Sequence, residues 1–457
     1  MFSSEDTIVA LATPRGRGGL GVVRLSGPSA RSIAQGLLGR ATPLEPRHAT
    51  LTRLVESEAG ERRAIDHVVA TLFPGPGSYT GEDVVEVSAH GSPVLLDRLV
   101  ELAVRAGARL AEPGEFTFRA FLHGRLDLVQ AEAVADLIDA VTPRQARVAF
   151  DQLEGTMTGR IKGLDDRLFD LIARLEASLD FPDEGYHFVE PGEVAEAIAG
   201  LRREILSALG EASQGRLLRE GGQVLILGTP NVGKSSIFNA LLGSSRSIVA
   251  DQAGTTRDLV SERLDLEGLA VTLVDSAGLR QTTDEVEGAG VERARGALGV
   301  AAAALVVLDR SRPLAEGDLE AVAETAGGSQ VVAVNKVDLP AAWEPSERAE
   351  LGDSTVVEVA ATSGRGLAGR RAGLSRALAG GEALRDSPAV ANRRHIGLLE
   401  EAAAALEAAG ASVARGSTEE FVLADLTRAR GAFEELTGTR APDDVLEHIF
   451  ERFCIGK

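Results

Sequence analysis

Hydrophobic and polar residues follow two different spacings along the chain. Up to about residue 118, short apolar runs separated by turn residues predict strands with some helix, the clearest strands being Thr7–Ala12, Val22–Leu25 and Val84–Ser88. From about Phe118 the apolar positions recur every three or four residues, which is typical of amphipathic helices. The first part is therefore expected to be α+β and the next part helical.

The helical pattern is interrupted once. Thr142 and Pro143 predict the start of one helix, as N-cap and first helical residue, and Gly155 predicts its end. From about Gly221 strands, loops and helices alternate, which favours a parallel α/β sheet, and helical spacing returns near Arg393. We expect an α/β domain inserted into a discontinuous helical domain. The predicted boundaries are 1–118 for the N-terminal domain, 119–216 and 383–457 for the two helical parts, and 217–382 for the α/β domain.

Length and composition agree with several globular domains, since 457 residues exceed what one hydrophobic core holds. The longest apolar stretch, Ala297–Leu308, is shorter than the roughly 18 to 20 residues of a membrane span and predicts a buried strand. The N-terminal residues lack the pattern of a secretory signal, and the single cysteine, Cys454, fits a reducing compartment. We expect a cytoplasmic protein with no membrane association.

The net charge of −20 limits how the chain can hold a nucleic acid. A protein that binds RNA by itself usually carries a basic stripe, and the sequence has no basic run. Contact with RNA is therefore expected to be local or to come mostly from a partner. Lysine is rare as well, and two of the few lysines, Lys234 and Lys336, fall inside the motifs described next.

The segment Gly16–Gly21 matches G-x-G-x-x-G, the dinucleotide-binding fingerprint. That fingerprint requires a helix after its third glycine, so that the helix N-terminus faces the pyrophosphate. The strand pattern Val22–Leu25 follows instead. A tight β-turn is the better interpretation.

A second glycine-rich segment, Gly228–Ser235, matches the P-loop motif. It follows the apolar strand Val224–Leu227 and leads into the helical run Ser236–Leu242, which is the context that the motif requires. In a P-loop, backbone N–H groups surround the phosphates, the lysine (Lys234) contacts the β- and γ-phosphates, and the hydroxyl of Ser235 coordinates Mg²⁺. A chance glycine-rich turn would have neither the strand nor the helix.

Three further segments complete a guanine-nucleotide site. Asp275–Gly278 ends an apolar strand, where the carboxylate of Asp275 can reach Mg²⁺ through water. Asn335–Asp338 ends another, and a carboxylate there accepts two hydrogen bonds from guanine but none of that pair from adenine. Ala360–Thr362 is placed for backbone contact with the base. These segments together predict a GTPase, not an ATPase.

The segment Gly254–Asp258 lies where a switch loop belongs, and Thr256 is the natural second protein ligand for Mg²⁺. Leu279 stands where Ras-like enzymes carry a water-orienting glutamine, so the attacking water must be placed in another way. Lys234 and Asp275 are also predicted to be catalytic. The predicted GTP-binding residues are Asn231, Val232, Gly233, Lys234, Ser235, Ser236, Ala250, Asp251, Gln252, Ala253, Gly254, Thr255, Thr256, Asp275, Ser276, Ala277, Gly278, Asn335, Lys336, Asp338, Ala360, Ala361 and Thr362.

Asn231 in the P-loop, the switch sequence, Leu279 and the C-terminal Phe453–Lys457 together resemble the MnmE (TrmE) family of tRNA-modifying GTPases. The resemblance spans nearly the whole chain. It includes the N-terminal segments Thr7–Ala10, Thr80–Val84, Pro113–Phe116 and Leu126–Ala133.

The resemblance implies a potassium-activated reaction. Asn231, Ala250, Gln252 and Thr255 match the positions that hold K⁺ in the family, where the cation takes the place of an arginine finger. Glu287 matches the carboxylate proposed to orient the attacking water. From the residues alone, the alternative for Glu287 is a solvated acidic helix start.

The resemblance also implies that the N-terminal domain binds 5-formyl- or methylene-tetrahydrofolate. Arg24, Glu86 and Arg125 match the folate-contacting positions, with Lys457 nearby. Cys454 has two interpretations, a buried thiol in a terminal helix or a group close to the folate chemistry. Zinc is not expected, because the sequence has no histidine cluster or H-E-x-x-H motif.

The family implies that GTP hydrolysis drives G-domain dimerisation and conformational change in a homodimer. With a flavin-containing partner of the MnmG (GidA) type, in a heterotetramer, it would modify the wobble uridine of certain tRNAs at carbon 5, adding a carboxymethylaminomethyl or aminomethyl group. The alternative is an Era- or Der-like regulatory or ribosome-assembly GTPase. Those proteins carry a KH-type module or tandem G domains, and the sequence shows neither.

Overall fold

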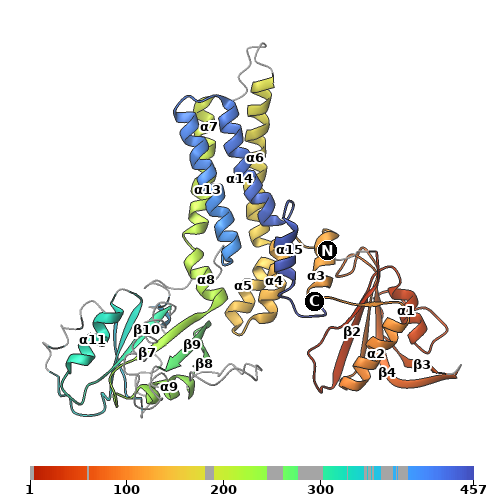
Figure 1. Cartoon of the computed structure of the whole chain (residues 1–457), viewed down its shortest axis with the longest axis horizontal. Helices are drawn as coiled ribbons and strands as arrows, with labels where there is room; N and C mark the ends of the chain where they lie inside the picture. Colours follow the sequence, from red (N-terminus) through yellow and green to blue (C-terminus); the bar gives the residue numbers. More distant parts are fainter. Residues whose placement is uncertain are drawn as a thin grey trace. The chain divides into compact units, whose positions relative to one another are not determined.

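The computed structural model describes residues 5–58, 61–180, 190–243, 261–275, 302–326, 328–343, 347, 351, 355–361, 374–376, 378 and 390–457 (Figure 1). The chain forms two compact units, each built from separate stretches of sequence. The first comprises Met1–Ala135, Gln152–Ile198 and Ala404–Lys457, and the second Asp136–Asp151 and Ala199–Ala403.

The first unit begins with a mixed, mainly antiparallel sheet in the order β3-β4-β5-β2-β1-β6. Helices α1 and α2 pack on this sheet, and their apolar side chains form one core with the buried strand residues. The expected strands at residues 7–12, 22–25 and 84–88 are confirmed, whereas the long β3–β4 hairpin was not anticipated. The elements are β1 (Ile8–Leu11), β2 (Leu20–Ser26), α1 (Ala30–Leu37), β3 (Thr50–Glu58), β4 (Glu61–Phe73), β5 (Val84–His90), α2 (Pro93–Arg105) and β6 (Arg109–Leu110).

The glycine-rich segment 16–21 runs directly into strand β2, as expected for a turn and not for a dinucleotide loop. The N–H of Gly18 donates to the carbonyl of Gly91, at 3.0 Å. The turn is therefore tied to the residue that follows β5.

The apolar spacing from residue 118 to 137 predicted continuous helix, but the structure has a break. Helix α3 (Glu115–Leu122) ends before Gly124, whose φ of 65° is left-handed. Helix α4 (Leu128–Asp139) starts after Asp127, whose side chain accepts the N–H of Gln130 at 2.8 Å. Capping residues thus separate two helices whose apolar positions are in phase.

The remaining helices confirm the expected helical regions. Thr142 caps α5, since its hydroxyl accepts the N–H of Gln145 at 3.2 Å. Helices α6 and α14 lie side by side in the first unit (Figure 1). No helix among the described residues is both long and apolar enough to cross a membrane. The helices are α5 (Pro143–Leu153), α6 (Thr156–Asp180), α7 (Pro191–Leu209), α8 (Ala212–Glu220), α13 (Arg393–Ala414), α14 (Glu419–Thr437) and α15 (Asp443–Phe450).

The second unit holds the expected α/β sheet, in the order β12-β11-β10-β7-β9-β8, parallel except for the β8–β9 hairpin. Strand β10 is buried along its whole length, which confirms the strand expected within the longest apolar stretch. Apolar clusters cover both faces of the sheet. The elements are β7 (Gly222–Leu227), α9 (Lys234–Gly243), β8 (Ser261–Leu266), β9 (Leu269–Asp275), β10 (Ala303–Asp309), α11 (Glu316–Thr325), β11 (Gln330–Asn335) and β12 (Thr355–Glu358).

Candidate functional site

The predicted nucleotide motifs lie at one edge of the parallel sheet. The P-loop follows β7, Asp275 ends the neighbouring β9, Asn335 ends β11, and Ala360 and Ala361 follow β12. These are the carboxyl ends of parallel strands, which meet at the same edge. Motifs more than a hundred residues apart are thereby brought together.

The P-loop holds its lysine against its own backbone. The ammonium of Lys234 donates to the carbonyl oxygens of Gly228 and Thr229, each at 3.0 Å. Gly233 has a φ of 99°, and a Cβ there would lie 2.2 Å from the side-chain nitrogen of Asn335. Glycine is required at this position because the loop turns closely past Asn335.

Ser235 and Asp275 form a pair suited to a divalent cation. The hydroxyl of Ser235, at the start of α9, lies 3.3 Å from a carboxylate oxygen of Asp275, which is buried at the end of β9. Hydroxyl and carboxylate oxygens are ligands that Mg²⁺ accepts. The pair fits the predicted Mg²⁺ site, with Ser235 as ligand and Asp275 within reach of a bound water.

Asn335 links the P-loop to the base-binding segment. Its side chain is 2% exposed; the amide nitrogen donates to the carbonyl of Val232 at 2.9 Å, and the amide oxygen accepts the N–H of Ala361 at 3.3 Å. Asp338, three residues on, is exposed at the start of the following loop. The segment predicted to read guanine is therefore anchored through the buried Asn335, whereas Asp338 is exposed.

Lys336 crosses from the same segment to the P-loop. Its ammonium donates to the carbonyl of Asn231 at 3.1 Å and to the carboxylate of Asp309 at 2.6 Å. Burial raises the pKa of Asp309, but hydrogen bonds from Lys336 and Ser311 outweigh it, and the pKa lies below its usual range. Asn231 and Lys336 both have positive φ, 64° and 61°, which marks the crossing as a strained backbone.

Several predicted residues lie outside the described part of the chain, so their placement stays a prediction. They are Ala250, Asp251, Gln252, Ala253, Gly254, Thr255, Thr256, Ser276, Ala277, Gly278, Leu279, Glu287 and Thr362. The described residues Asn231, Val232, Gly233, Lys234, Ser235, Ser236, Asp275, Asn335, Lys336, Asp338, Ala360 and Ala361 lie on or next to the carboxyl edge of the sheet.

A second cluster of predicted residues lies in the first unit. Arg24 on β2 and Glu86 on β5 are opposite each other in the antiparallel ladder, and a guanidinium nitrogen lies 2.8 Å from the carboxylate. The guanidinium carbon also stands over the rings of Tyr79 and Phe116, 5.3 and 5.6 Å from their centroids. The side chain of Arg24 is thus held by one carboxylate and two aromatic rings.

The C-terminal segment reaches this pair. Ile455 forms an antiparallel bridge with Pro113, and the carbonyl of Gly456 accepts a hydrogen bond from Arg24 at 3.4 Å. Burial lowers the pKa of Lys457, and the charge of Arg24 lowers it further, against the opposing effects of Glu86 and Cys454. The predicted folate residues Arg24, Glu86 and Lys457 are therefore brought together.

Cys454 and Arg125, the other two residues predicted near the folate, are both exposed. Cys454 is exposed and follows the end of α15, so the alternative of a buried thiol in a terminal helix is wrong. Arg125 is exposed in the α3–α4 loop, where its N–H donates to the carbonyl of Ala120 and its side chain lies against Gly81.

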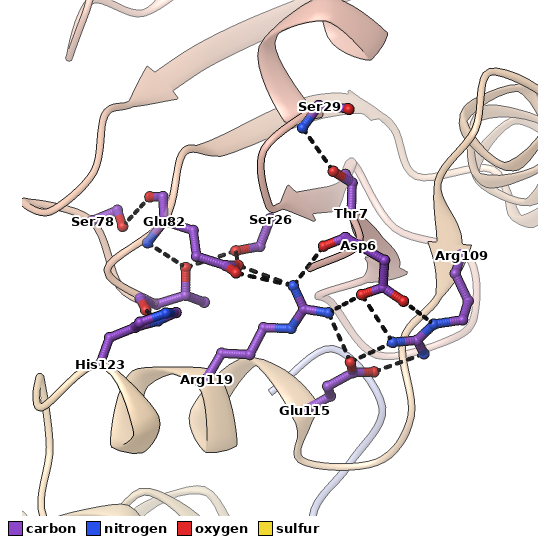
Figure 2. A network of polar contacts seen from close by, with 11 residues as sticks. Asp6, Thr7, Ser26, Ser29, Ser78, Glu82, Arg109, Glu115, Arg119 and His123 are labelled. Carbon is purple, nitrogen blue, oxygen red and sulfur yellow. Dashed lines mark hydrogen bonds and ion pairs between the residues drawn. The ribbon is translucent and has the colours of Figure 1, made fainter. Parts of the chain in front are cut away.

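A network of ion pairs surrounds the buried Arg119 of α3 in the same unit (Figure 2). Arg119, 0% exposed, makes ion pairs with Asp6, Glu82 and Glu115 at 2.5, 3.1 and 3.0 Å. Glu82 also accepts a hydrogen bond from Ser26, which lies two residues from Arg24 on β2. These side chains tie α3 to β2 and to the turn before β5. Sequence patterns alone did not predict this network.

Three other sets of residues were also missed from sequence. Asp309 ends a buried strand, as Asp275 and Asn335 do, and that position was the available signal. Thr229, Arg312 and Asp318 contact one another beside the P-loop, but no spacing in the sequence connects them. Tyr79 and Phe116 likewise come from separate elements.

A parallel sheet whose carboxyl edge joins a P-loop lysine, a strand-end aspartate and an Asn-Lys-x-Asp segment defines a P-loop GTPase, and the chain is a GTP hydrolase of this class. The family model for the MnmE helical domain matches residues 128–454, and the model for the GTP-binding protein TrmE N-terminus matches residues 7–125. The chain belongs to the MnmE (TrmE) family.

Individual relatives agree. The tRNA modification GTPase MnmE of Koribacter versatilis (strain Ellin345) is 43% identical over 458 residues, covering 99% of each chain. The protein of the same name from Pseudomonas entomophila (strain L48) is 41% identical over 462 residues, covering all of both. Among solved structures, the G domain of the T. maritima FeoB iron transporter is 25% identical, covering 34% of this chain and 98% of its own, with a TM-score of 0.27.

Proposed function

We propose that this tRNA modification GTPase modifies carbon 5 of the wobble uridine, using a tetrahydrofolate one-carbon donor and a flavin-containing partner of the MnmG type. The observation that carries the GTPase part is the meeting of Lys234, Asp275 and Asn335 at one sheet edge, in a chain 43% identical to a tRNA modification GTPase over its whole length. The acidic net charge of −20 supports a partner that supplies much of the tRNA contact.

For GTP hydrolysis, we propose that Lys234 binds the β- and γ-phosphates while Asp338 accepts hydrogen bonds from guanine. Ser235 and Thr256 hold Mg²⁺, which neutralises phosphate charge when bound. Glu287 orients the attacking water, since Leu279 has no group that can do so. Asn231, with Ala250, Gln252 and Thr255, binds K⁺ in place of an arginine finger.

For the one-carbon donor, we propose that Arg24 and Glu86 form the centre of a folate site, with Lys457 beside them and Arg125 at its edge. The guanidinium suits the carboxylates of the folate glutamate, and Glu86 can accept hydrogen bonds from the pterin. The pairing of Arg24 with Glu86 and the docking of the C-terminal segment on Arg24 support this assignment. Cys454 then lies next to the donor, exposed to substrate.

We further propose a cytoplasmic homodimer with four segments: a folate-binding and dimerising domain (1–118), a helical domain in two parts (119–216 and 383–457) and a G domain (217–382). The family models meet between residues 125 and 128, close to the first of these boundaries.

Nucleoside analysis of tRNA tests the proposal directly. Cells that lack this protein should lose the carbon 5 modification of the wobble uridine and regain it when the wild-type chain is expressed. An unchanged nucleoside profile would reject the proposed substrate. The cation assignment is tested separately, because GTP hydrolysis should be faster in K⁺ than in Na⁺ at equal ionic strength, and equal rates would remove it.

Saturable binding of 5-formyltetrahydrofolate tests the donor site. The Arg24→Ala variant should bind it more weakly, while its GTP hydrolysis stays at the wild-type rate. The absence of saturable binding by the wild-type chain would favour a regulatory GTPase that acts without a one-carbon donor.

A further inference from the structure

The second residue of the P-loop, Thr229, is held from outside the loop. Its hydroxyl donates to a carboxylate oxygen of Asp318 at 2.5 Å and accepts a hydrogen bond from the guanidinium of Arg312 at 2.6 Å. Arg312 also donates to both oxygens of Asp318, at 3.1 Å. The three side chains therefore form a closed triangle, called here the P-loop brace.

The brace is anchored in helix α11. Asp318 is 1% exposed in the first turn of α11, and its second oxygen accepts the N–H of Ala315 at 3.1 Å, which caps the helix. The methyl group of Thr229 faces Gly317, where an added Cβ would lie 3.3 Å away. Thr229 is thus confined on its methyl side as well as through its hydroxyl.

The brace holds the backbone that contacts Lys234, the residue proposed to bind the phosphates. The carbonyl of Thr229 accepts a hydrogen bond from Lys234 at 3.0 Å, as does the carbonyl of Gly228. Because the hydroxyl and the carbonyl belong to the same residue, the position of one constrains the other. A shift of the Thr229 backbone would carry the ammonium of Lys234 with it.

We propose that Asp318 and Arg312 are positioning residues for GTP hydrolysis, which act through Thr229 to fix the ammonium of Lys234. This inference rests on the proposed role of Lys234 in phosphate binding. Small displacements of a charged group in a phosphoryl-transfer site have large effects on rate, since such sites work mainly by position and charge. Arg312 is 38% exposed, so its contribution is expected to be smaller than that of Asp318.

Steady-state GTP hydrolysis by the full chain tests the brace. Thr229→Val removes the hydroxyl at nearly constant volume, and Asp318→Asn removes the charge. We expect each to lower kcat about tenfold while KM changes less, because ground-state contacts to the nucleotide remain. Thr229→Ser retains the hydroxyl and should therefore keep the wild-type kcat.

Controls separate positioning from loss of folding. Glu320→Gln makes the same chemical change as Asp318→Asn at an exposed position on α11 and should leave kcat unchanged. Trp343, the single tryptophan, donates to the carbonyls of Asp309 and Arg312, so its fluorescence reports on the segment that carries Arg312. In Thr229→Val the emission should stay as in the wild type.

The rates of the variants distinguish an error in the role of Lys234 from an error in the role of the brace. If Lys234→Ala hydrolyses GTP at the wild-type rate, the role of Lys234 is wrong. If Lys234→Ala is inactive but folded Thr229→Val and Asp318→Asn keep the wild-type kcat, the brace does not position the lysine. A loss of kcat in Glu320→Gln equal to that in Asp318→Asn would also overturn the proposal.

Discussion

At the scale of single residues, the buried polar groups of the nucleotide site each have a particular partner. Asn335 uses both ends of its amide, one as donor to Val232 and one as acceptor from Ala361. A carboxylate could accept but not donate, so aspartate would leave the carbonyl of Val232 facing a like charge. Asp338, by contrast, is exposed. Neighbouring residues of one motif therefore serve different purposes.

Asp338→Asn should change nucleotide preference. A carboxylate accepts two hydrogen bonds from guanine, whereas an amide accepts only one of them and turns its NH2 donor toward the other guanine donor. Two charge-assisted bonds of about 1.5–3 kcal/mol each predict a loss of GTP affinity of at least about a hundredfold. Xanthosine triphosphate, with a carbonyl in place of the amine, should bind the variant better than the wild type. Calorimetric titration measures both, and unchanged GTP affinity would contradict the role of Asp338.

Asp6 should make the first unit sensitive to acid. Hydrogen bonds from Arg109 and Arg119 hold the pKa of Asp6 below its usual range, against burial, which raises it. A lowered pKa means that the stabilisation is present above the unfolded value of about 3.9 and is lost as pH falls through the folded value. Asp6→Asn should cost about 1 kcal/mol at pH 7, after allowance for solvent screening, and less at pH 2. Urea unfolding at the two pH values measures the difference; an equal cost at both would contradict it.

At the scale of elements, the start of α5 holds the β8–β9 hairpin. The hydroxyl of Thr142 caps the helix and also donates to the carbonyl of Gly268 at 2.8 Å, in the turn of the hairpin. The amide of Gln145 donates to the carbonyl of Arg219 at 3.1 Å. Strand β9 of this hairpin ends at Asp275. A helical segment and a strand of the nucleotide site are thereby joined.

Thr142→Val should loosen this junction. The change removes the N-cap and the bond to Gly268, which predicts a loss of about 1–2 kcal/mol from the second unit. Hydrogen exchange should rise in β8 and β9 but not in β11. Thr142→Ser retains the hydroxyl and serves as the matched control. If exchange in the hairpin matched the wild type, the junction would have no measurable strength.

Gly456→Ala should displace the C-terminal segment. Gly456 has a φ of 99°, and a Cβ there would lie 2.3 Å from the carbonyl oxygen of Leu11. The substitution should therefore break the contact of this segment with Arg24 and weaken 5-formyltetrahydrofolate binding about tenfold or more. Ile455→Ala, at an exposed side chain, should bind as the wild type does. Equal affinities of Gly456→Ala and wild type would show that the segment does not contribute to the site.

At the scale of the whole molecule, the two proposed ligand sites belong to different compact units. The nucleotide motifs lie within the second unit, and Arg24, Glu86 and Lys457 lie within the first, although Lys457 is separated from Arg24 by the entire second unit in sequence. Each unit is built from non-contiguous stretches. A ligand of one site therefore acts first on the stability of its own unit.

Calorimetric unfolding should show this separation. A ligand at about 100 times its Kd stabilises the state that binds it by about 2.7 kcal/mol. GDP should raise the transition of the second unit and 5-formyltetrahydrofolate that of the first. Lys234→Ala should remove only the shift caused by GDP, and Arg24→Ala only the shift caused by 5-formyltetrahydrofolate. A single transition that both ligands move equally would mean that the units unfold together.

A feature of the fold or the site could be predicted from the sequence when its residues are consecutive in the chain. The P-loop was predicted because strand, glycine loop and helix are consecutive. The break at Gly124 was missed because the apolar spacing continues through it, although the glycine and Asp127 are capping residues. The pairing of Arg24 with Glu86 was expected from resemblance alone, since only the register of β2 with β5 makes them neighbours.

The sequence by itself determined the nucleotide motifs, the order of strands and helices around them and the family, because each motif consists of residues close together in the chain. Only the tertiary structure decided that Asp318 and Arg312 reach Thr229, that Thr142 reaches Gly268, and that the C-terminal segment meets Arg24. These contacts join residues far apart in sequence. Their formation depends on strand register and on the packing of whole elements, which no local spacing encodes.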